Sequence, residues 1–392
     1  MNQNNILNQP DNLNYLIAIA QKFISKSAPT AEIKNIQPFG NGNINSTFLV
    51  SLQDIEQDIE IKSLATSFVL QRINTNVFPE PQLVMQNMRI YSNHVRDRLA
   101  KIPLQRRWEV PQVLLTDEGQ DYWLTENGEY WRSLSFIADS HSFDVMESTS
   151  QASEVGYALG TFHYLTSDLS PKKLADTLVG FHITPQYLRQ YQEVLAKSQA
   201  ANKVQNSPEL NYCFQIISDR QGLANILEDA KVAGKLPLRT MHGDPKVNNI
   251  LFDQQTNLAM SMIDLDTVKS GLIHYDIGDC LRSGCNPLGE DVTEWEDVNF
   301  DTELCSAILS GYLEIGRSFL TEYDYAYIYD AIRVITFELG LRFFTDYLAG
   351  NQYFTVKYPE HNLQRTLVQF RLLESIEAQA SIIQKIIQSA WH

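Results

Sequence analysis

The sequence predicts an α+β protein of two lobes, an antiparallel N-terminal sheet with a packed helix followed by a mostly helical C-terminal lobe. Up to about residue 135, short β-rich runs alternate with turn signals, and one helical stretch interrupts them. From Thr149 onward, apolar residues recur at helical spacing. We therefore predict an N-lobe over residues 1–136 and a C-lobe over residues 137–392.

The size and charge of the chain restrict its partners. At 392 residues it is long enough for two lobes with a sizeable core. Its formal net charge of −16 argues against nucleic acid or an anionic membrane as the main partner, because phosphate-rich surfaces select basic patches. No run of about 18 apolar residues is present, so we expect no membrane span. An acidic surface suits a neutral or cationic small molecule, and the sequence carries no signal for an oligomeric state.

The cysteines and the N-terminus indicate the compartment. Cys213, Cys280, Cys285 and Cys305 form no CxxC pair and no zinc-binding spacing. The first residues are polar and Asn-rich, without the basic start and apolar stretch of a signal peptide. We interpret the cysteines as free thiols in a reducing compartment and expect a cytoplasmic protein.

The elements of the predicted N-lobe follow one another in a simple order. Residues 12–26 have the period of an amphipathic helix, and Ser67–Ile73 is a β-rich strand. Residues 80–100 form a helix opened by a proline near its first turn. Asn127-Gly128, between two aromatic-flanked runs, predicts a β-hairpin.

The predicted C-lobe is a succession of helices. Residues 150–169 place small residues such as Gly160 on the same stripe as apolar ones, which predicts a tightly packed helix. A turn at Thr184-Pro185 precedes an amphipathic helix, and residues 211–230 form another. The tail from 303 to 392 is almost wholly helical in period.

Residues 241–266 carry the polar pattern around which the chain is organised. His242-Gly243-Asp244 is followed by Asn249, an apolar run, a polar turn and a second apolar run that ends at Asp264. Each residue alone has a plain interpretation as a buried histidine, a turn-forming acid or a cap. Polar residues that interrupt strand-like runs must be hydrogen-bonded or used, however, because burying them unpaired is costly.

The spacing of these residues is typical of a kinase-type site. In such a site one Asp accepts the proton of the attacking hydroxyl, and an Asn and a further Asp hold magnesium. Two short strands that bring Asn249 and Asp264 to one edge would form a divalent-metal site of hard oxygen ligands. We predict Asp244 as the catalytic residue, Asn249 and Asp264 as Mg²⁺ ligands, and ATP as the phosphoryl donor.

The N-lobe departs from the kinase pattern where charge is needed. On the strand that usually carries a phosphate-binding Lys, Gln71 occupies that position and cannot supply charge. Arg72 is next to it, but strand alternation points Arg72 to the opposite face. The helix that follows has only Glu80, at its very start, to complete the usual ion pair.

Backbone groups of the N-lobe are further candidates for nucleotide binding. The backbone N–H groups of a Gly-rich turn that contains Gly40 and Gly42 could contact phosphates. A plain β-turn explains both glycines equally well. Phe136 and Ile137 lie at the expected hinge, where backbone groups hydrogen-bond adenine. The candidate cofactor-binding residues are Gly40, Gly42, Gln71, Arg72, Phe136 and Ile137.

The segments HGDPKVNNILFD and MIDLDTVKSGLIHYDIGDCLR resemble the motif pair of the aminoglycoside phosphotransferase superfamily, which includes choline kinase-like and other metabolite kinases. Within it the chain is most similar to the N-acetylhexosamine 1-kinase group. The similarity extends over most of the chain, including YWRSLSFI and LGLRFFTDYLAGNQYF. The resemblance implies a two-lobed protein-kinase-like fold, ATP and Mg²⁺ as cofactors, and a small-molecule sugar substrate.

The resemblance also implies residues for the acceptor. Asp266 would be a carboxylate behind the metal ligands or in contact with the sugar, and Arg342 and Tyr353 match positions used on the sugar. An Arg among helical aromatics is otherwise a packing residue. Asp279 would tie the catalytic loop or cap a helix. The Gly-rich turn departs from the group's GHIND-like pattern, with Gly42-Asn43-Ile44-Asn45-Ser46 in its place.

The predicted reaction is transfer of the ATP γ-phosphoryl group to a sugar hydroxyl, with the anomeric 1-OH of an N-acetylhexosamine as the first candidate. Two alternatives stay open. An acidic acceptor pocket would favour an amino alcohol or aminoglycoside-like acceptor. The missing strand Lys and helix Glu would favour a non-catalytic nucleotide-binding protein with a kinase-like fold.

Overall fold

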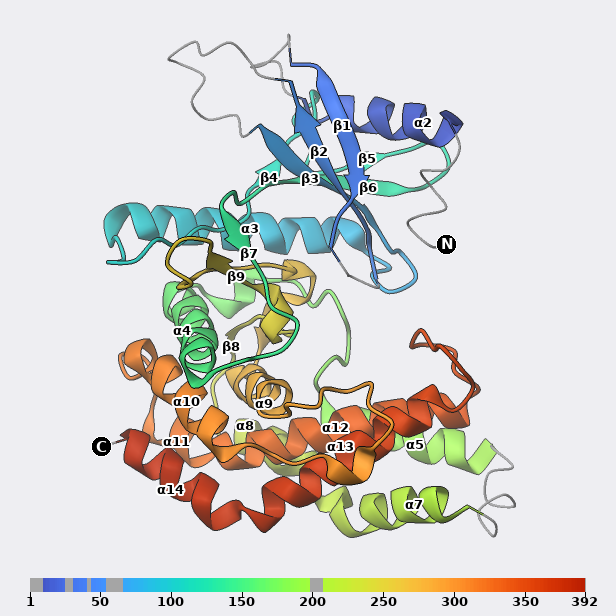
Figure 1. The fold of residues 1–392 in the computed structure, drawn as a ribbon, viewed down its shortest axis with the longest axis vertical. Helices are drawn as coiled ribbons and strands as arrows, with labels where there is room; N and C mark the ends of the chain where they lie inside the picture. Colours follow the sequence, from blue (N-terminus) through green and yellow to red (C-terminus); the bar gives the residue numbers. More distant parts are fainter. Residues whose placement is uncertain (1–9, 25–30, 41–43, 54–65, 198–206, 392) are drawn as a thin grey trace. The chain divides into compact units, whose positions relative to one another are not determined.

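A computed structural model describes residues 10–24, 31–40, 44–53, 66–197 and 207–391 (Figure 1). The chain divides into two compact units. Unit 1 runs to Ser140 and includes Lys172–Leu178, and unit 2 contains His141–Pro171 and the chain from Val179 onward. The predicted fold class is confirmed, because unit 1 is built on an antiparallel sheet and unit 2 is mostly helical.

Unit 1 holds a six-stranded antiparallel sheet. Its strands follow the order β1-β2-β3-β6-β4, and β5 pairs with β6. Thr47 of β2 pairs with Gln71 of β3, which pairs with Arg132 of β6, so these three side chains share one face. The predicted hairpin at Asn127-Gly128 joins β5 and β6. The strands are β1 (Ile33–Pro38), β2 (Ser46–Leu52), β3 (Ser67–Ile73), β4 (Val113–Leu114), β5 (Trp123–Leu124) and β6 (Tyr130–Ser135).

Two helices pack in unit 1, α2 (Pro10–Gln21) and α3 (Pro81–Lys101). Apolar side chains of α2 pack with Phe48, Leu70 and Trp131 of the sheet. Because side chains alternate across a strand, Gln71 and Arg132 lie on the face away from α2. On α3, Val84 and Met85 pack with Ile73 and Phe78 in a second apolar cluster.

Unit 2 is a set of helices around three short strand pairings. β9 pairs with β10 and with β7, and β11 pairs with β8. None of the helices within the described residues is long and apolar enough to cross a membrane. The four cysteines are buried and free. The strands are β7 (Ser140–His141), β8 (Arg239–Met241), β9 (Ile250–Asp253), β10 (Ala259–Met262) and β11 (Lys269–Gly271). The helices are α4 (Thr149–Thr166), α5 (Thr184–Lys197), α7 (Pro208–Arg220), α8 (Ile226–Val232), α9 (Ile273–Gly284), α10 (Thr302–Gly316), α11 (Glu322–Ala326), α12 (Ile328–Leu348), α13 (His361–Ala378) and α14 (Ala380–Trp391).

The single helix predicted over residues 211–230 is wrong. α7 begins earlier, at Pro208, and ends at Arg220, and a 3-10 turn (Gln221–Asn225) separates it from α8. Gly222 lies in this turn, where its low helix propensity favours the break. Two shorter helices therefore replace one long one.

Close packing of α4 on α10 supports the predicted small-residue stripe. A methyl group at Gly156 or Gly160 of α4 would collide with backbone atoms of α10, at Ile308 and Tyr312 respectively. A methyl group at Gly311 of α10 would in turn overlap the carbonyl oxygen of Ser153. The backbones of the two helices therefore approach each other as closely as glycine allows.

Gly311→Ala is expected to lower the free energy of unfolding by about 1–3 kcal/mol, because two helix backbones must separate to admit the methyl group. Chemical denaturation of the full chain measures this change. Gly222→Ala is the matched control, since a methyl group there meets no atom within 4 Å. Equal stability of Gly311→Ala and the wild-type chain would contradict the close approach.

Candidate active site

The loop that carries Asp244 begins where β8 ends, at Met241. Gly243 has a φ of 87°, and a methyl group there would lie 2.8 Å from Cβ of Thr267. The hydroxyl of Thr267 also donates to the carbonyl oxygen of His242 at 2.7 Å. The glycine of the His-Gly-Asp motif is therefore required both by its backbone conformation and by the close neighbour.

Asp276 of α9 holds this loop from behind. Its carboxylate accepts hydrogen bonds from the backbone N–H groups of His242 (2.6 Å) and Gly243 (2.8 Å). It also contacts Nε2 of the buried His163 at 2.9 Å, and Nδ1 of His163 lies 3.0 Å from the Tyr312 hydroxyl. Burial raises the pKa of Asp276, but His163 and His242 together lower it to below its ordinary value. The group that fixes the loop is an ionised carboxylate.

Asp279, the residue expected to tie the loop, lies one turn further along α9. Its carboxylate accepts a hydrogen bond from Nε of Arg282 at 2.7 Å. Both interpretations of Asp279 were wrong, because Asp276 makes the loop contacts and Asp279 lies inside α9 rather than at its cap. Two acids three residues apart share one side of a helix, so their spacing alone does not distinguish them.

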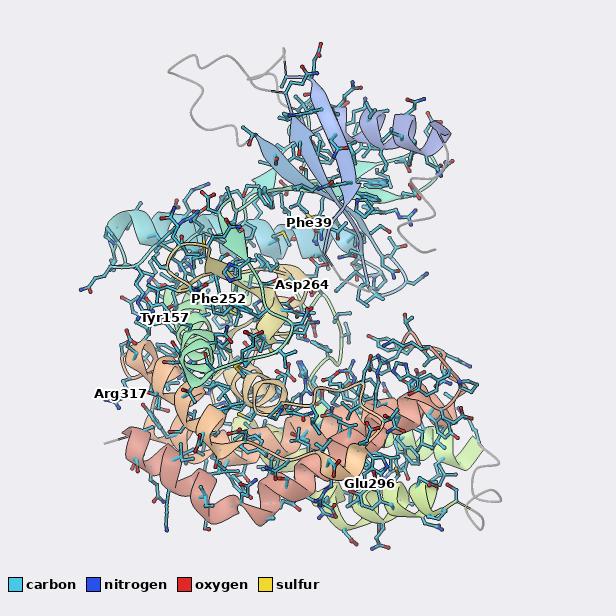
Figure 2. All side chains as sticks on the ribbon, viewed as in Figure 1. Phe39, Tyr157, Phe252, Asp264, Glu296 and Arg317 are labelled. Carbon is cyan, nitrogen blue, oxygen red and sulfur yellow. The ribbon has the colours of Figure 1, made fainter. Side chains whose placement is uncertain are left out.

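The β9–β10 hairpin brings Asn249 and Asp264 to the same end. Ile250 pairs with Met262, and the N–H of Ile263 donates to the carbonyl oxygen of Asn249 at 2.9 Å. Asp264 follows β10 with a left-handed backbone (φ 62°, ψ 57°) and is labelled in Figure 2. The register of the hairpin therefore places Asn249 beside the residue that precedes Asp264. The two predicted ligands thus lie at the same end of the hairpin, as the sequence predicted.

His242 connects the two halves of the motif. Its ring is fully buried and lies 3.0 Å, through Nε2, from the carbonyl oxygen of Ile263, while Nδ1 accepts from the N–H of Asp244 at 3.3 Å. Burial lowers the pKa of His242, which favours the neutral ring that this donor and acceptor pattern needs. The histidine thus holds the loop of Asp244 against the residue that precedes Asp264.

The Asp244 carboxylate is ionised and partly exposed. Asn249 donates through Nδ2 to its backbone oxygen (2.8 Å) and to Oδ2 (3.1 Å), and Nζ of Lys246 lies 2.8 Å from the same Oδ2. Burial raises the pKa of Asp244, but the Lys246 ammonium, together with His242 and Asn249, lowers it to below its ordinary value. Burial lowers the pKa of Lys246, and the charges of Asp244 and Asp264 raise it above its ordinary value.

Lys246 was missed as a site residue. Its charge acts on both predicted acids, Asp244 and Asp264. The signal available in the sequence was its position, two residues after Asp244 in an otherwise apolar and amide-bearing stretch.

The donor atoms beside Asp244 suit magnesium. Asn249 turns its amide nitrogen toward Asp244, so its amide oxygen faces away from that carboxylate, and the carboxylate of Asp264 is near enough for its charge to act on Lys246. Mg²⁺ prefers such oxygen ligands and usually keeps water or phosphate oxygens in its remaining positions. The roles of Asn249 and Asp264 as metal ligands stay predictions.

The predicted acceptor residues Arg342 and Tyr353 flank one aromatic side chain in unit 2. The Arg342 guanidinium lies 4.9 Å from the ring centroid of Tyr187, 5.4 Å from that of Phe181 and 5.5 Å from that of Phe354. The ring of Tyr353 packs on Phe354 with centroids 4.8 Å apart, and Tyr353 is 59% exposed. We call Arg342, Phe181, Tyr187, Tyr353 and Phe354 the Arg342 cluster.

A buried ion pair connects the Arg342 cluster to the loop that carries Asp244. His182, next to Phe181, contacts Glu338 of α12 through Nδ1 at 2.8 Å and the carbonyl oxygen of Gly243 through Nε2 at 3.0 Å. Burial lowers the pKa of His182, but the Glu338 carboxylate and the Gly243 carbonyl together raise it to above its ordinary value. The remaining predicted acceptor residue, Asp266, is buried in the 3-10 turn Leu265–Thr267.

The predicted nucleotide contacts of unit 1 lie in different environments. Gly40 has a φ of 75°, and a methyl group there would meet no atom within 4 Å. Gly42 lies outside the described residues. Phe136 packs edge-to-face on Phe39 with centroids 5.8 Å apart, and the carbonyl oxygen of Ile137 accepts from the Ser140 hydroxyl at 2.7 Å. Their roles in nucleotide binding stay predictions.

Gln71 and Arg72 occupy opposite faces of β3, as strand alternation predicts. Gln71 donates to the Thr47 hydroxyl at 3.0 Å and accepts from Nε of Arg132 at 2.9 Å. On the α2 face, Arg72 forms an ion pair with Glu129 at 2.6 Å. Glu129 also accepts from the Tyr15 hydroxyl of α2, so the charge of Arg72 is engaged on that side.

A family model described as the phosphotransferase enzyme family matches residues 35–312, which is most of the chain. The chain belongs to this family. Membership in the phosphotransferase family confirms the predicted superfamily and the predicted enzyme class, a small-molecule phosphotransferase.

Solved structures show the same fold at low sequence identity. A choline kinase from Cryptosporidium parvum Iowa II is 14% identical with a TM-score of 0.58, covering 95% of this chain and 97% of that one. A microcompartment-associated aminopropanol kinase is 13% identical with a TM-score of 0.59, covering 95% and 98%. An aminoglycoside phosphotransferase from Alicyclobacillus acidocaldarius is 15% identical with a TM-score of 0.58, covering 94% and 95%. At these identities the similarities show that the fold is shared. They do not identify the acceptor that this chain phosphorylates.

Proposed function

We propose that the protein transfers the γ-phosphoryl group of ATP to a hydroxyl of a small-molecule acceptor, with Asp244 as the residue that orients and deprotonates that hydroxyl. The proposal is supported by the state of Asp244, whose ionised, partly exposed carboxylate is positioned by Asn249 and Lys246. An ionised carboxylate can accept a proton, and its fixed position lowers the entropic cost of reaching the transition state.

Charge stabilisation would be divided among the neighbours of Asp244. Asn249 and Asp264 are the proposed magnesium ligands, and a Mg²⁺ ion held by them would supply charge neutralisation at the phosphates. Lys246 pairs with Asp244, whose pKa it lowers, and its charge also interacts with that of Asp264. The Asp276 carboxylate holds the loop rigid, so these groups do not reorganise as the reaction proceeds.

The proposed acceptor is an N-acetylhexosamine, phosphorylated at the anomeric 1-OH. The observation that carries this choice is the Arg342 cluster, which is connected to the catalytic loop through His182. A guanidinium repels the ammonium group of an amino alcohol or an aminoglycoside, whereas it can donate hydrogen bonds to neutral hydroxyl and acetamido oxygens. Aromatic rings such as Tyr353 can pack on the apolar face of a sugar.

An amino alcohol or aminoglycoside is the second candidate. It is supported by the fold shared with proteins described as a choline kinase, an aminopropanol kinase and an aminoglycoside phosphotransferase, and by the net charge of −16. The non-catalytic alternative rests on Gln71, which supplies no charge at the position of the usual strand Lys.

An acceptor screen separates these candidates. ADP release is measured with ATP, Mg²⁺ and N-acetylglucosamine, N-acetylgalactosamine, choline or kanamycin. We expect turnover with at least one N-acetylhexosamine, and phosphorus NMR should show an anomeric phosphate. Turnover confined to choline or kanamycin would overturn the sugar proposal, and turnover with none of the four would favour the non-catalytic alternative.

The substitution Arg342→Gln tests the residue on which the proposal of an N-acetylhexosamine acceptor depends. We expect the KM for the sugar to rise by about 10- to 100-fold, because hydrogen bonds from a charged group are lost. Arg333→Gln is the matched control on the same helix, since Arg333 pairs with Asp330 outside the Arg342 cluster. An unchanged KM in Arg342→Gln would remove the support for a sugar acceptor.

A further inference from the structure

The loop between α12 and α13 carries two rings of the Arg342 cluster, Tyr353 and Phe354 (Figure 1). Phe354 is partly buried, with its ring centroid 4.6 Å from that of Phe343 and 5.5 Å from the Arg342 guanidinium. Tyr353 is 59% exposed, so its ring adds little to the core of unit 2. Because so much of Tyr353 faces solvent, the backbone of the loop must fix its position.

One buried carboxylate holds this backbone. Asp346, in the last turn of α12, is 7% exposed. Its Oδ1 accepts from the N–H groups of Gln352 and Tyr353, both at 2.8 Å, and its Oδ2 accepts from the N–H of Phe354 at 2.9 Å. Successive N–H groups that converge in this way form an anion-binding concavity, and here the chain's own carboxylate fills it. Three neighbouring peptide groups are thus tied to one turn of α12.

Asn362, at the start of α13, adds a fourth donor to this carboxylate. Its Nδ2 donates to Oδ2 of Asp346 at 2.9 Å and to Oδ1 of Asn351 at 3.0 Å. Each oxygen of Asp346 therefore accepts two hydrogen bonds, which offset the hydration that a buried carboxylate loses. Asn351 also donates through its own Nδ2 to the carbonyl oxygen of Pro359 at 2.8 Å, so the two ends of the loop are joined.

The chain turns back toward Asp346 through two residues with left-handed backbones. Gly350 has a φ of 89° and Asn351 a φ of 58°. Glycine adopts this conformation without steric cost, and asparagine tolerates it better than most residues. The N–H of Asn351 donates to the backbone oxygen of Asp346 at 2.8 Å. This reversal directly after α12 brings the next three N–H groups back to the Asp346 side chain.

A second carboxylate, Asp291, holds the far part of the loop. It contacts Nζ of Lys357 at 2.9 Å, Nε2 of His361 at 3.1 Å and Nε of Arg365 at 2.8 Å. Arg365 also donates through Nη1 to the carbonyl oxygen of Thr355 at 3.2 Å. These contacts lie beyond the two rings, whose own N–H groups are held by the first carboxylate.

We propose that Asp346 is the positioning residue of the acceptor site, and that it fixes Tyr353 and Phe354 beside Arg342 before the acceptor binds. The inference rests on the proposed function, because it takes the Arg342 cluster as the acceptor site. A loop that is already ordered loses little conformational freedom when a ligand binds, so this preorganisation raises the affinity for the acceptor. Both oxygens of Asp346 are engaged by the chain, so the carboxylate acts through the rings.

Acceptor kinetics and ATP binding of Asp346→Asn test the proposal. The amide has only one accepting oxygen, so at least one of the three loop N–H groups faces an NH₂ group. We expect the KM for N-acetylglucosamine, or for whichever of N-acetylgalactosamine, choline and kanamycin the chain uses in its place, to rise by about 5- to 30-fold. The kcat and the Kd for ATP should stay within about twofold of wild type. Asp330→Asn, on the same helix, is the control and should leave all three values unchanged.

A mutant cycle separates the positioning role from a purely structural one. Tyr353→Ala combined with Phe354→Ala removes the rings that Asp346 is proposed to position. In that background Asp346→Asn should raise the acceptor KM by no more than about twofold further, because substitutions that act through the same groups are not additive. A full additional effect would mean that Asp346 acts by another route, and it would overturn the inference.

Hydrogen exchange gives a readout that does not depend on turnover. In the wild-type chain the amides of residues 352–354 should be protected, because all three donate to one carboxylate. In Asp346→Asn they should exchange at least about tenfold faster. Equal exchange in the two chains would show that the carboxylate does not hold the loop and would overturn the inference.

Gly350→Val disturbs the same loop from its exposed side, and it gives a result even if Asp346→Asn folds poorly. A β-branched residue is strained at this positive φ, so the turn should open and the acceptor KM should rise while the Kd for ATP is kept. Gly234→Val is the matched control. Gly234 also has a positive φ, of 71°, and in both glycines an added methyl group meets no atom within 4 Å.

The outcomes distinguish this inference from the proposed function. Wild-type acceptor KM in both Asp346→Asn and Gly350→Val would overturn the inference and leave the proposed function standing. Equal losses of ATP affinity and acceptor affinity would indicate general destabilisation and would also overturn it. A wild-type chain that turns over none of the four acceptors would overturn the proposed function and this inference together.

Discussion

Asp244→Asn is expected to lower kcat by about 10²- to 10⁴-fold, the usual contribution of a general base, while ATP still binds. The amide keeps the size of the side chain and its contact with Asn249, but it cannot accept the proton of the acceptor hydroxyl. Coupled ADP-release assays measure kcat, and calorimetry measures the Kd for ATP in the same preparation. Retention of affinity with loss of turnover is the signature of a catalytic role.

Asp219→Asn is a matched control for this substitution. Asp219 is an exposed carboxylate on α7 whose side chain accepts from Gln215 at 2.8 Å. The kcat of the Asp219→Asn variant should equal that of the wild-type chain. Turnover of Asp244→Asn within a few-fold of this control would exclude Asp244 as the base and require another group to activate the hydroxyl.

Asp276→Asn is expected to damage both stability and activity. The amide can accept at only one oxygen, so one of the two loop N–H groups of His242 and Gly243 is left facing an NH₂ group. Loss of a buried charged acceptor should lower the free energy of unfolding by about 3 kcal/mol. Release of the loop should lower kcat by at least about 10²-fold, since an error of about 1 Å in a catalytic group costs that much.

The effect of Asp276 should depend on pH in a defined direction. Its pKa is lowered in the folded chain, so its contribution to stability is present above the unfolded pKa of about 3.9 and is lost as pH falls through the folded value. The stability difference between wild type and Asp276→Asn should therefore be largest near pH 7 and shrink below about pH 4. Denaturation curves between these pH values measure it.

Asp330→Asn provides the comparison for Asp276. Asp330 pairs with Arg333 one turn along α12, with a quarter of its side chain exposed. A partly exposed pair of this kind contributes at most about 1 kcal/mol. If Asp276→Asn costs no more than Asp330→Asn, the carboxylate of Asp276 does not hold the loop.

Local patterns made most of the fold predictable. Alternating β-rich runs and the Asn127-Gly128 turn indicated the sheet of unit 1, and helical period indicated unit 2. The end shared by Asn249 and Asp264 was also predictable, because a hairpin with a short turn sets its own register. The break between α7 and α8 was not predicted, since one apolar period continues across it.

Contacts between distant segments were beyond what sequence patterns indicate. Asp276 and Asp279 are three residues apart on one helix, and only the packing of α9 against the loop decides which one meets His242. Arg132 is 61 residues from Gln71, and its relation to that residue depends on β6 pairing with β3. Neither contact corresponds to a residue spacing that could be recognised in the sequence.

The sequence by itself determined the order Asp244, Asn249 and Asp264 and the hairpin between the last two, because both depend on neighbours along the chain, and its motif pair predicted the phosphotransferase class. Only the tertiary structure decided that Asp276 holds the loop that carries Asp244, and that Arg132 shares the face of Gln71. The physical reason is that hydrogen bonds and charges act over a few ångströms in space, whatever the distance along the chain.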